Sequence, residues 1–354
     1  MGERIATIYY GNETRNGKSK WVQDTMLPDR EGLAWHLQDY DIDLALAIPN
    51  AADGFDRVWR PEFDPSGSLT GGQVEQVTAL GLGAVILDRH SNGYGTKHLE
   101  SPAPRVNETA VQVFGADKYA AYTEIHGQLP EAIPTYLLAN IDAALDDIQD
   151  GPFIAKPITG SMGRGIHSFA SKAALVEWAT ALTKVEREAY ILQPKYDFTG
   201  PLARVRPYTY QDAIRTSELN KSDLSKEVRV YTFHNPHTGA MEFSAVPRCT
   251  TPSATNRRAE DHWFFADQEP LLERLARPAG ETAYFLARAA GVVAVYISVD
   301  FGYGARGDEA PDWRLIEANT RFPYLLGPDK HPELSAHIRD QFARHVNRVI
   351  ETAA

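Results

Sequence analysis

The residues best suited to chemistry lie near the carboxyl-terminal end of the sequence, on two predicted strands over 292–301 and 313–318. Side chains on a strand alternate between its faces, so Asp300 shares a face with Ser298, and Glu317 shares a face with Asn319. Two carboxylates and an amide are hard oxygen donors, which suit Mg²⁺. The edge of a solvated strand could carry the same residues, so this pattern alone leaves both interpretations open.

A second chemical feature is a lysine on a predicted strand, followed at once by a glycine-rich turn. Lys156 ends the strand, and Gly160, Gly163 and Gly165 follow it. Glycines let backbone N–H groups approach phosphate oxygens, and a lysine adds a positive charge. The spacing fits neither the P-loop nor the dinucleotide fingerprint. A glycine-rich hairpin turn is the alternative interpretation.

The order of the motifs along the chain is more specific than any single motif. The sequence carries, in this order, a helix with Asp117-Lys118, the strand lysine with its glycine turn, a strand that ends in Gln193-Pro194-Lys195-Tyr196, the strand that begins at Glu227, then Arg248, Asp300, and Glu317 with Asn319. This ordered set resembles the ATP-grasp superfamily over about residues 105–325.

The resemblance implies a role for each phosphate-binding and metal-binding residue. Lys118 and Lys156 would neutralise the α- and β-phosphates of ATP. The turn 160–165, with Ser161, Gly163 and Gly165, would close over the triphosphate. The metal ligands of the resemblance are Asp300, Glu317 and Asn319, which would hold Mg²⁺ ions that bridge the β- and γ-phosphates.

The resemblance also places the adenine in a hinge that begins at Gln193. The superfamily uses backbone groups here, so the Pro194 carbonyl would accept from the adenine amino group, and the N–H near Lys195 or Tyr196 would donate to the ring. A proline is compatible with this position, because only its carbonyl is used and the N–H that proline lacks is not needed.

The resemblance assigns Glu227 to the ribose hydroxyls, and it gives Arg229, which follows in the strand, a catalytic role together with Arg248. Arg248 would stabilise the negative charge that develops on the transferred phosphoryl group or the tetrahedral intermediate. The hinge departs from the usual pattern, and about thirty residues separate it from Glu227, so Asp197 competes for the ribose role.

The long hinge segment 198–226 adds four cationic residues, and we expect it to help recognise an anionic substrate. These residues are Arg204, Arg206, Arg215 and Lys221. Cys249, which follows Arg248 in the sequence, is expected to be an inert, buried thiol, because nothing in the sequence would activate it.

The hydrophobic patterning predicts an α/β protein with three parts: a small N-terminal α/β lobe over 1–110, and two α+β subdomains over 111–190 and 191–354 that clamp ATP between them. In the first lobe we expect strands at 5–9, 44–48 and 84–87, helices at 30–40 and 70–80, and a loop over 61–67. A single helix is predicted over 110–125 and a packing helix over 333–352.

Composition and charge exclude several classes of protein. The net charge is −11 over 354 residues. Residues 1–150 carry a net −12, from 11 Lys and Arg against 23 Asp and Glu, whereas residues 184–258 carry +4, from 12 against 8. This distribution argues against nucleic-acid binding and is compatible with a small anionic ligand. No stretch is long and apolar enough for a membrane span, and the lone cysteine suits a reducing compartment, so we expect a cytoplasmic protein.

The function that the resemblance implies is ATP-dependent amide or peptide-bond formation between a small-molecule or peptide carboxylate and an amine, through an acyl phosphate. Two alternatives stay open: a kinase that phosphorylates a hydroxyl, and a non-catalytic ATP-binding scaffold. The predicted cofactors are ATP and Mg²⁺. The N-terminal lobe does not indicate a substrate, and a homodimer is compatible with the sequence.

Overall fold

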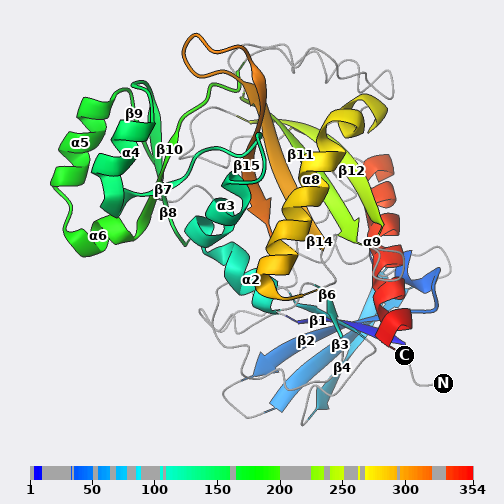
Figure 1. Ribbon diagram of the computed structural model, residues 1–354. Helices are drawn as coiled ribbons and strands as arrows, with labels where there is room; N and C mark the ends of the chain where they lie inside the picture. The colour runs from blue at the N-terminus through cyan, green and yellow to red at the C-terminus, as the bar shows by residue number, and fades with distance from the viewer. Residues whose placement is uncertain are drawn as a thin grey trace.

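Three β-sheets organise the computed structural model, one in each of three consecutive parts of the chain (Figure 1). The structure describes residues 4–9, 33, 36–50, 55–63, 69–77, 85–88, 104–106, 109–159, 165–199, 225–234, 240–250, 262–263, 268–292, 296–320 and 332–353. Within these ranges, no helix has the length and apolar character that crossing a bilayer requires.

The N-terminal sheet has six strands in the order β4-β3-β2-β1-β5-β6. Its strands are β1 (Ile5–Tyr9), β2 (Asp43–Asn50), β3 (Phe55–Phe63), β4 (Leu69–Val77), β5 (Val85–Asp88) and β6 (Arg105–Val106). The strands β2, β1, β5 and β6 run parallel, whereas β3 and β4 are added antiparallel at one edge. The three predicted strands are therefore present.

Two predictions for this lobe were wrong. The helix expected over 70–80 is strand β4, which pairs with β3 along its length. Adjacent Gly71 and Gly72 and the β-branched residues that follow disfavour a helix, and the partner strand satisfies their backbone groups. The loop expected over 61–67 begins late, because β3 continues to Phe63.

The second sheet is small and has the order β7-β10-β8-β9. It consists of β7 (Tyr136–Leu137), β8 (Phe153–Pro157), β9 (His167–Phe169) and β10 (Tyr190–Pro194). Helices α4 (Ile141–Asp147), α5 (Lys172–Thr180) and α6 (Lys184–Glu188) accompany it, and its buried cluster includes Phe153, Leu175 and Leu192. Ser171 and Thr183 cap the two later helices through their side chains, which fixes where each begins.

The third sheet is antiparallel, with the order β13-β12-β11-β14-β15. Its strands are β11 (Ser225–His234), β12 (Met241–Thr250), β13 (His262–Trp263), β14 (Tyr296–Gly304) and β15 (Asp312–Asn319), and the long helices are α8 (Gln268–Ala290) and α9 (Pro332–Ala353). Figure 1 shows α8 and α9 on opposite sides of this sheet. The predicted C-terminal packing helix is therefore present.

The helix predicted over 110–125 is broken into α2 (Thr109–Ala116) and α3 (Lys118–His126). Asp117 lies between them in an extended conformation, and its side chain accepts a hydrogen bond from the Ala120 N–H at 3.0 Å. This is an N-cap, which starts a new helix at Lys118. The break therefore sets the position of the lysine that was singled out in the sequence.

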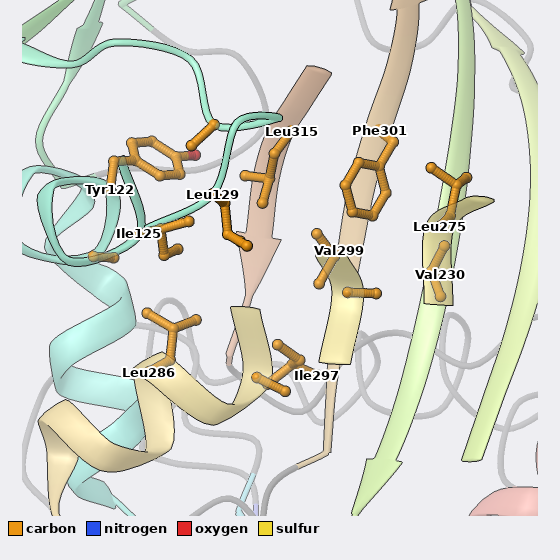
Figure 2. Packing of buried hydrophobic residues seen from close by; sticks show 14 of the residues in the cluster. Tyr122, Ile125, Leu129, Val230, Leu275, Leu286, Ile297, Val299, Phe301 and Leu315 are labelled. Carbon is orange, nitrogen blue, oxygen red and sulfur yellow. The ribbon is translucent and has the colours of Figure 1, made fainter. Parts of the chain in front are cut away.

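The central strands of the third sheet bury both faces. Figure 2 shows Val230, Ile297, Val299, Phe301 and Leu315 directed toward the side of α3 and α8. Burying each such side chain contributes roughly 1.5–3 kcal/mol.

The opposite face of the same sheet packs against α9. The aromatic residues Phe233 and Tyr296 lie in one buried cluster with Phe342 of α9, and the same cluster contains Ala6 and Leu87 of the N-terminal sheet. Helix α9 therefore joins the first sheet to the third.

The segment after β10 is tied to the hairpin between β14 and β15. Asp197 and Ala305 exchange two backbone hydrogen bonds, at 2.8 and 3.2 Å. Gly304 permits this approach, because a Cβ atom there would lie 1.9 Å from the Asp197 carbonyl oxygen. The small sheet and the third sheet are thus connected at a point where any side chain would clash.

We expect Gly304→Ala to lower the free energy of unfolding by about 1–3 kcal/mol, because backbone must move to admit the methyl group. The measurement is urea unfolding, with Gly127→Ala as the matched control. A Cβ atom at Gly127 would meet nothing within 4 Å. Equal stability of the two variants would contradict the close-packing argument.

Candidate functional site

The predicted metal ligands meet on one face of the third sheet. Asp300 on β14 lies directly opposite Arg229 on β11 and directly opposite Glu317 on β15. In the adjacent row of the sheet, Ser298 lies opposite Asn319. Directly opposed residues share a face and have Cβ atoms about 4.5–5.5 Å apart. The structure therefore brings together Asp300, Glu317 and Asn319, and adds Arg229 to them.

Arg229 and Asp300 form a buried, bidentate ion pair. Arg229 Nε donates to Asp300 Oδ1 at 2.7 Å, and Nη2 donates to Oδ2 at 2.8 Å. The side chains are only 14% and 1% exposed. Burial acts to lower the pKa of Arg229, but the charge of Asp300 and these hydrogen bonds outweigh it, so the pKa of Arg229 is raised well above its usual value. The arginine thus stays charged and fixes the plane of the carboxylate.

The donor set fits a hard cation such as Mg²⁺. A carboxylate offers about four lone-pair sites, so Asp300 can accept from Arg229 and still bind a cation. Asn319 Nδ2 lies 3.5 Å from Asp300 Oδ2, which directs the amide nitrogen to the carboxylate and leaves the amide oxygen as a ligand. Among the described residues, no group of three or more His, Cys, Asp or Glu side chains could hold a metal. The candidate site is therefore two carboxylates and one amide.

The lysines predicted for the phosphates lie on elements that adjoin one another. Lys118 is the first residue of α3, and its backbone N–H donates to the Ile158 carbonyl at 3.1 Å, just beyond the end of β8. Lys156 on β8 lies opposite Ile191 on β10. Ile191 belongs to the buried cluster between the third sheet and the helices α3 and α8, and Ile158 packs against it, whereas Leu192, the next residue on β10, belongs to the cluster of the small sheet. Lys156 therefore lies on the face of the small sheet that is directed toward the cluster of α3 and α8.

The glycine turn after Lys156 is described only at its end. Ser161 and Gly163 lie outside the described residues. Gly165 has a φ of +71°, and a Cβ atom there would lie 2.9 Å from Pro157 Cγ. Both its conformation and its packing require glycine.

Gln193 has a side chain whose orientation is fixed by a chain of hydrogen bonds. Thr135 Oγ1 donates its only proton to the Ile133 carbonyl at 2.9 Å, so it must accept from Gln193 Nε2, which lies 2.8 Å away. Gln193 is 2% exposed, and its Oε1 atom is buried without a hydrogen-bond partner among the described residues. The hinge therefore presents a buried acceptor that a ligand amino group could satisfy.

The rest of the hinge is held by its backbone and by aromatic contacts. Pro194 is buried at the end of β10, and the Lys195 N–H donates to the Pro152 carbonyl at 2.9 Å. Arg314 lies over the Tyr196 ring, 5.1 Å from its centroid. No local sequence pattern marks Arg314 or Thr135 as a functional residue.

The two candidates for the ribose differ in their surroundings. Glu227 is half-buried on β11, in a row with Arg248 on β12 and Gly302 on β14, on the same face as the Arg229–Asp300 pair. Asp197 Oδ1 accepts from both the N–H and the hydroxyl of Thr199, and these hydrogen bonds lower the pKa of Asp197.

Several of the predicted site residues lie outside the described part of the chain. The side chains of Arg248 and Cys249 fall outside it, although their backbones lie in β12. The segment 200–224 is also outside the described residues, together with its cations Arg204, Arg206, Arg215 and Lys221.

Solved structures with a similar arrangement are ligases. The D-cycloserine synthetase DcsG has a TM-score of 0.58 at 12% identity, covering 98% of this chain and 99% of that chain. The D-alanyl-alanine synthetase A of Vibrio cholerae has a TM-score of 0.57 at 12% identity, covering 99% and 100%. The VanG D-Ala:D-Ser ligase of Enterococcus faecalis has a TM-score of 0.55 at 12% identity, covering all of both chains.

Sequence comparison adds no closer relative: no protein-family model matches the chain, and neither does any curated protein sequence. Identities this low establish a common fold and do not establish a common substrate.

We expect Arg229→Met to lower the free energy of unfolding by about 3–5 kcal/mol, because it leaves the buried Asp300 carboxylate without its partner. Chemical denaturation measures this change. The control is Lys184→Met, which breaks an exposed ion pair with Glu188 and should change stability by less than about 1 kcal/mol. A similar, small effect of both variants would show that Arg229 does not compensate Asp300.

Proposed function

From the ATP-grasp fold that this chain shares with those ligases, we propose that it is an ATP-dependent ligase that joins a carboxylate to an amine. The observation that carries the proposal is the row Arg229–Asp300–Glu317, with Asn319 beside it. On the same sheet face, Gly302 lies against Phe198, just after the hinge. A scaffold that only binds nucleotide would have no need of a fully charged, oriented metal-ligand set.

The proposed reaction has two steps. A carboxylate oxygen of the substrate attacks the γ-phosphorus of ATP, the bond from that phosphorus to the β,γ-bridging oxygen breaks, and ADP leaves. The amine nitrogen then attacks the acyl carbon, phosphate leaves with the bonding electrons, and the nitrogen loses a proton. The protein contributes mainly position and charge neutralisation, since phosphoryl transfer needs little covalent help.

The charge of the metal site supports binding of the ion together with nucleotide. Asp300 and Glu317 bring two negative charges, and the paired Arg229 offsets one of them. The net negative charge that attracts a cation is therefore small until the phosphates of ATP add to it. Asp300, Glu317 and Asn319 would hold Mg²⁺, which when bound neutralises charge on the β- and γ-phosphates.

The phosphates would lie between the face of the small sheet that carries Lys156 and the start of α3 with Lys118. The turn with Ser161, Gly163 and Gly165 would cover them with backbone N–H groups. Arg248 would stabilise the charge that develops during transfer, and Arg229 would act on Asp300, both of whose oxygens it contacts.

The adenine would be recognised by the hinge. Gln193 Oε1 and the Pro194 carbonyl accept from its amino group. The Lys195 N–H is already used by Pro152, so the donor to the ring is assigned to the Tyr196 N–H. For the ribose we favour Glu227, because Asp197 is engaged with Thr199.

The substrate class is proposed to be a small, amino-acid-like acid or a peptide. The names of the three similar proteins refer to D-cycloserine, D-alanine and D-serine, so amino acids of both hands belong in the first substrate panel.

The test supplies Mg-ATP, hydroxylamine and a panel of amino acids, dicarboxylates and short peptides, and measures ADP and hydroxamate. Hydroxylamine traps acyl phosphates, so a ligase should give carboxylate-dependent ADP and a hydroxamate. ADP without hydroxamate would contradict the ligase assignment and favour a kinase.

We expect Glu317→Gln to reduce ADP formation about 100-fold or more, because a lost metal ligand removes several kcal/mol of charge stabilisation.

The control for Glu317→Gln is Asp312→Asn on the same strand. Asp312 forms an exposed pair with Arg274 at 3.2 Å and should leave activity unchanged. Circular dichroism should be the same for both variants. Undiminished ADP formation by Glu317→Gln would contradict the metal assignment.

We also expect Gln193→Met to weaken ATP binding about 5- to 100-fold, because a buried acceptor for the adenine amino group is lost. GTP has a carbonyl where ATP has the amino group, so we expect the protein to bind GTP more weakly than ATP. The affinity for GTP should change less in the variant, and the preference for ATP over GTP should therefore shrink. Calorimetric titration of both nucleotides measures this, with the exposed Gln128→Met as control. An unchanged ratio of the two affinities would show that Gln193 does not read the base.

A further inference from the structure

The strand that carries Glu317 and Asn319 contains a β-bulge immediately before Glu317. Asp300 lies opposite Glu317, but the next residue of β14, Phe301, lies opposite Leu315. Ile316 is therefore an extra residue on β15 with no register partner on β14. A bulge re-aims the side chains that follow it, so its geometry decides where Glu317 points.

The carbonyl of the extra residue is bound from outside the sheet. The Tyr122 hydroxyl of α3 donates to the Ile316 carbonyl at 3.2 Å. Tyr122 is 6% exposed, and its ring lies beside Leu315 and Leu129 in Figure 2. Burial, with the nearby charges of Glu317 and Asp300, raises the pKa of Tyr122 well above its usual value. The hydroxyl therefore remains a donor at any pH at which the protein would work.

The outer edge of β15 is bound at neighbouring positions as well. The Leu315 N–H donates to the Glu131 carbonyl at 2.8 Å. At the end of the strand, Gly115 of α2 packs so closely on Thr320 that a Cβ atom would lie 2.1 Å from Thr320 Oγ1. The segment from α2 to residue 131 thus covers an edge strand that would otherwise be free to shift.

The same helix reaches the other half of the candidate site. Lys118 lies one helical turn before Tyr122, and its N–H is bonded to Ile158 beyond β8. Helix α3 therefore contacts the strand of the metal ligands through Tyr122 and the strand of Lys156 through Lys118.

We propose that Tyr122 is a positioning residue for the reaction: by holding the Ile316 carbonyl it fixes the bulge that directs Glu317 toward the metal beside Asp300. The inference rests on the proposed function, because it concerns the same metal site. It assigns to α3 a second task beside carrying Lys118, which is to keep the metal ligands in register with the phosphate-binding residues.

The test compares wild-type protein with Tyr122→Phe, which removes the hydroxyl and keeps the ring in the core. Two readouts are used. Hydrogen exchange of the apo protein should become faster in peptides that cover 312–320. Titration with Mn²⁺ in the presence of ADP, followed by electron paramagnetic resonance, should show metal affinity reduced about 3- to 10-fold, while the affinity for ADP in EDTA stays unchanged.

The matched control is Tyr303→Phe, which removes a hydroxyl from the same hairpin. The ring of Tyr303 packs against that of Trp313, with the ring centroids 5.3 Å apart. It should match wild type in both readouts. If wild-type protein binds no Mn²⁺ with ADP, the proposed function is wrong. If wild type binds it and Tyr122→Phe binds it equally well, the positioning role is wrong. An equal loss of metal-free ADP affinity would show a general structural role instead, which also overturns the proposal.

Discussion

The buried ion pair between Arg229 and Asp300 is the constraint around which the third sheet is arranged. Strand β14 is covered on both faces, so a carboxylate on it lies away from water and needs a charged partner at hydrogen-bond distance. Arg229 meets this need because the antiparallel register places it directly opposite Asp300. The pair does not demand a cation to be stable. The carboxylate of Asp300 is therefore held in place by the protein alone.

Asp300 and its row also divide the face of the sheet into two parts. Toward the start of β14, Ser298 and Tyr296 lead to the aromatic contacts with Phe342 of α9. Toward its end, Gly302 and Gly304 lie under Phe198 and Asp197 of the hinge segment. One strand thus connects the core under α9, the charged row and the hinge. A displacement of β14 would disturb all three. Gly302 and Gly304 are needed at its end, because a Cβ atom at either position would clash with Phe198 or with the Asp197 carbonyl.

Much of this arrangement follows from local patterns in the sequence, and the parts that do not are contacts between distant residues. Alternation along a strand is a local property, so the shared face of Glu317 and Asn319 was predictable, whereas the register and the bulge decide that Asp300 lies on the same face. The break at Asp117 carried a signal, an N-cap residue inside an apolar run, which the single predicted helix overlooked. Strand β4 was mistaken for a helix although its apolar pattern is weak: Val74 and Val77 are three apart, as on a helix face, and pairing with β3 overrides this spacing. The hydrogen bond from Gln193 to Thr135 spans 58 residues, and that from Tyr122 to Ile316 spans 194, so neither leaves a trace in local spacing.

Both long-range contacts act by fixing the direction of a hydrogen bond. Thr135 has one proton and gives it to Ile133, which leaves its oxygen to accept from Gln193 and leaves the buried Gln193 Oε1 without a partner among the described residues. Tyr122 has one proton and gives it to the carbonyl of Ile316, the residue that has no register partner on β14. In each case a buried hydroxyl satisfies a backbone carbonyl, and the accounting of donors and acceptors leaves no other arrangement of equal energy. Under the proposed function, base recognition and metal geometry would depend on Thr135 and Tyr122, two hydroxyl groups that would not touch the substrate.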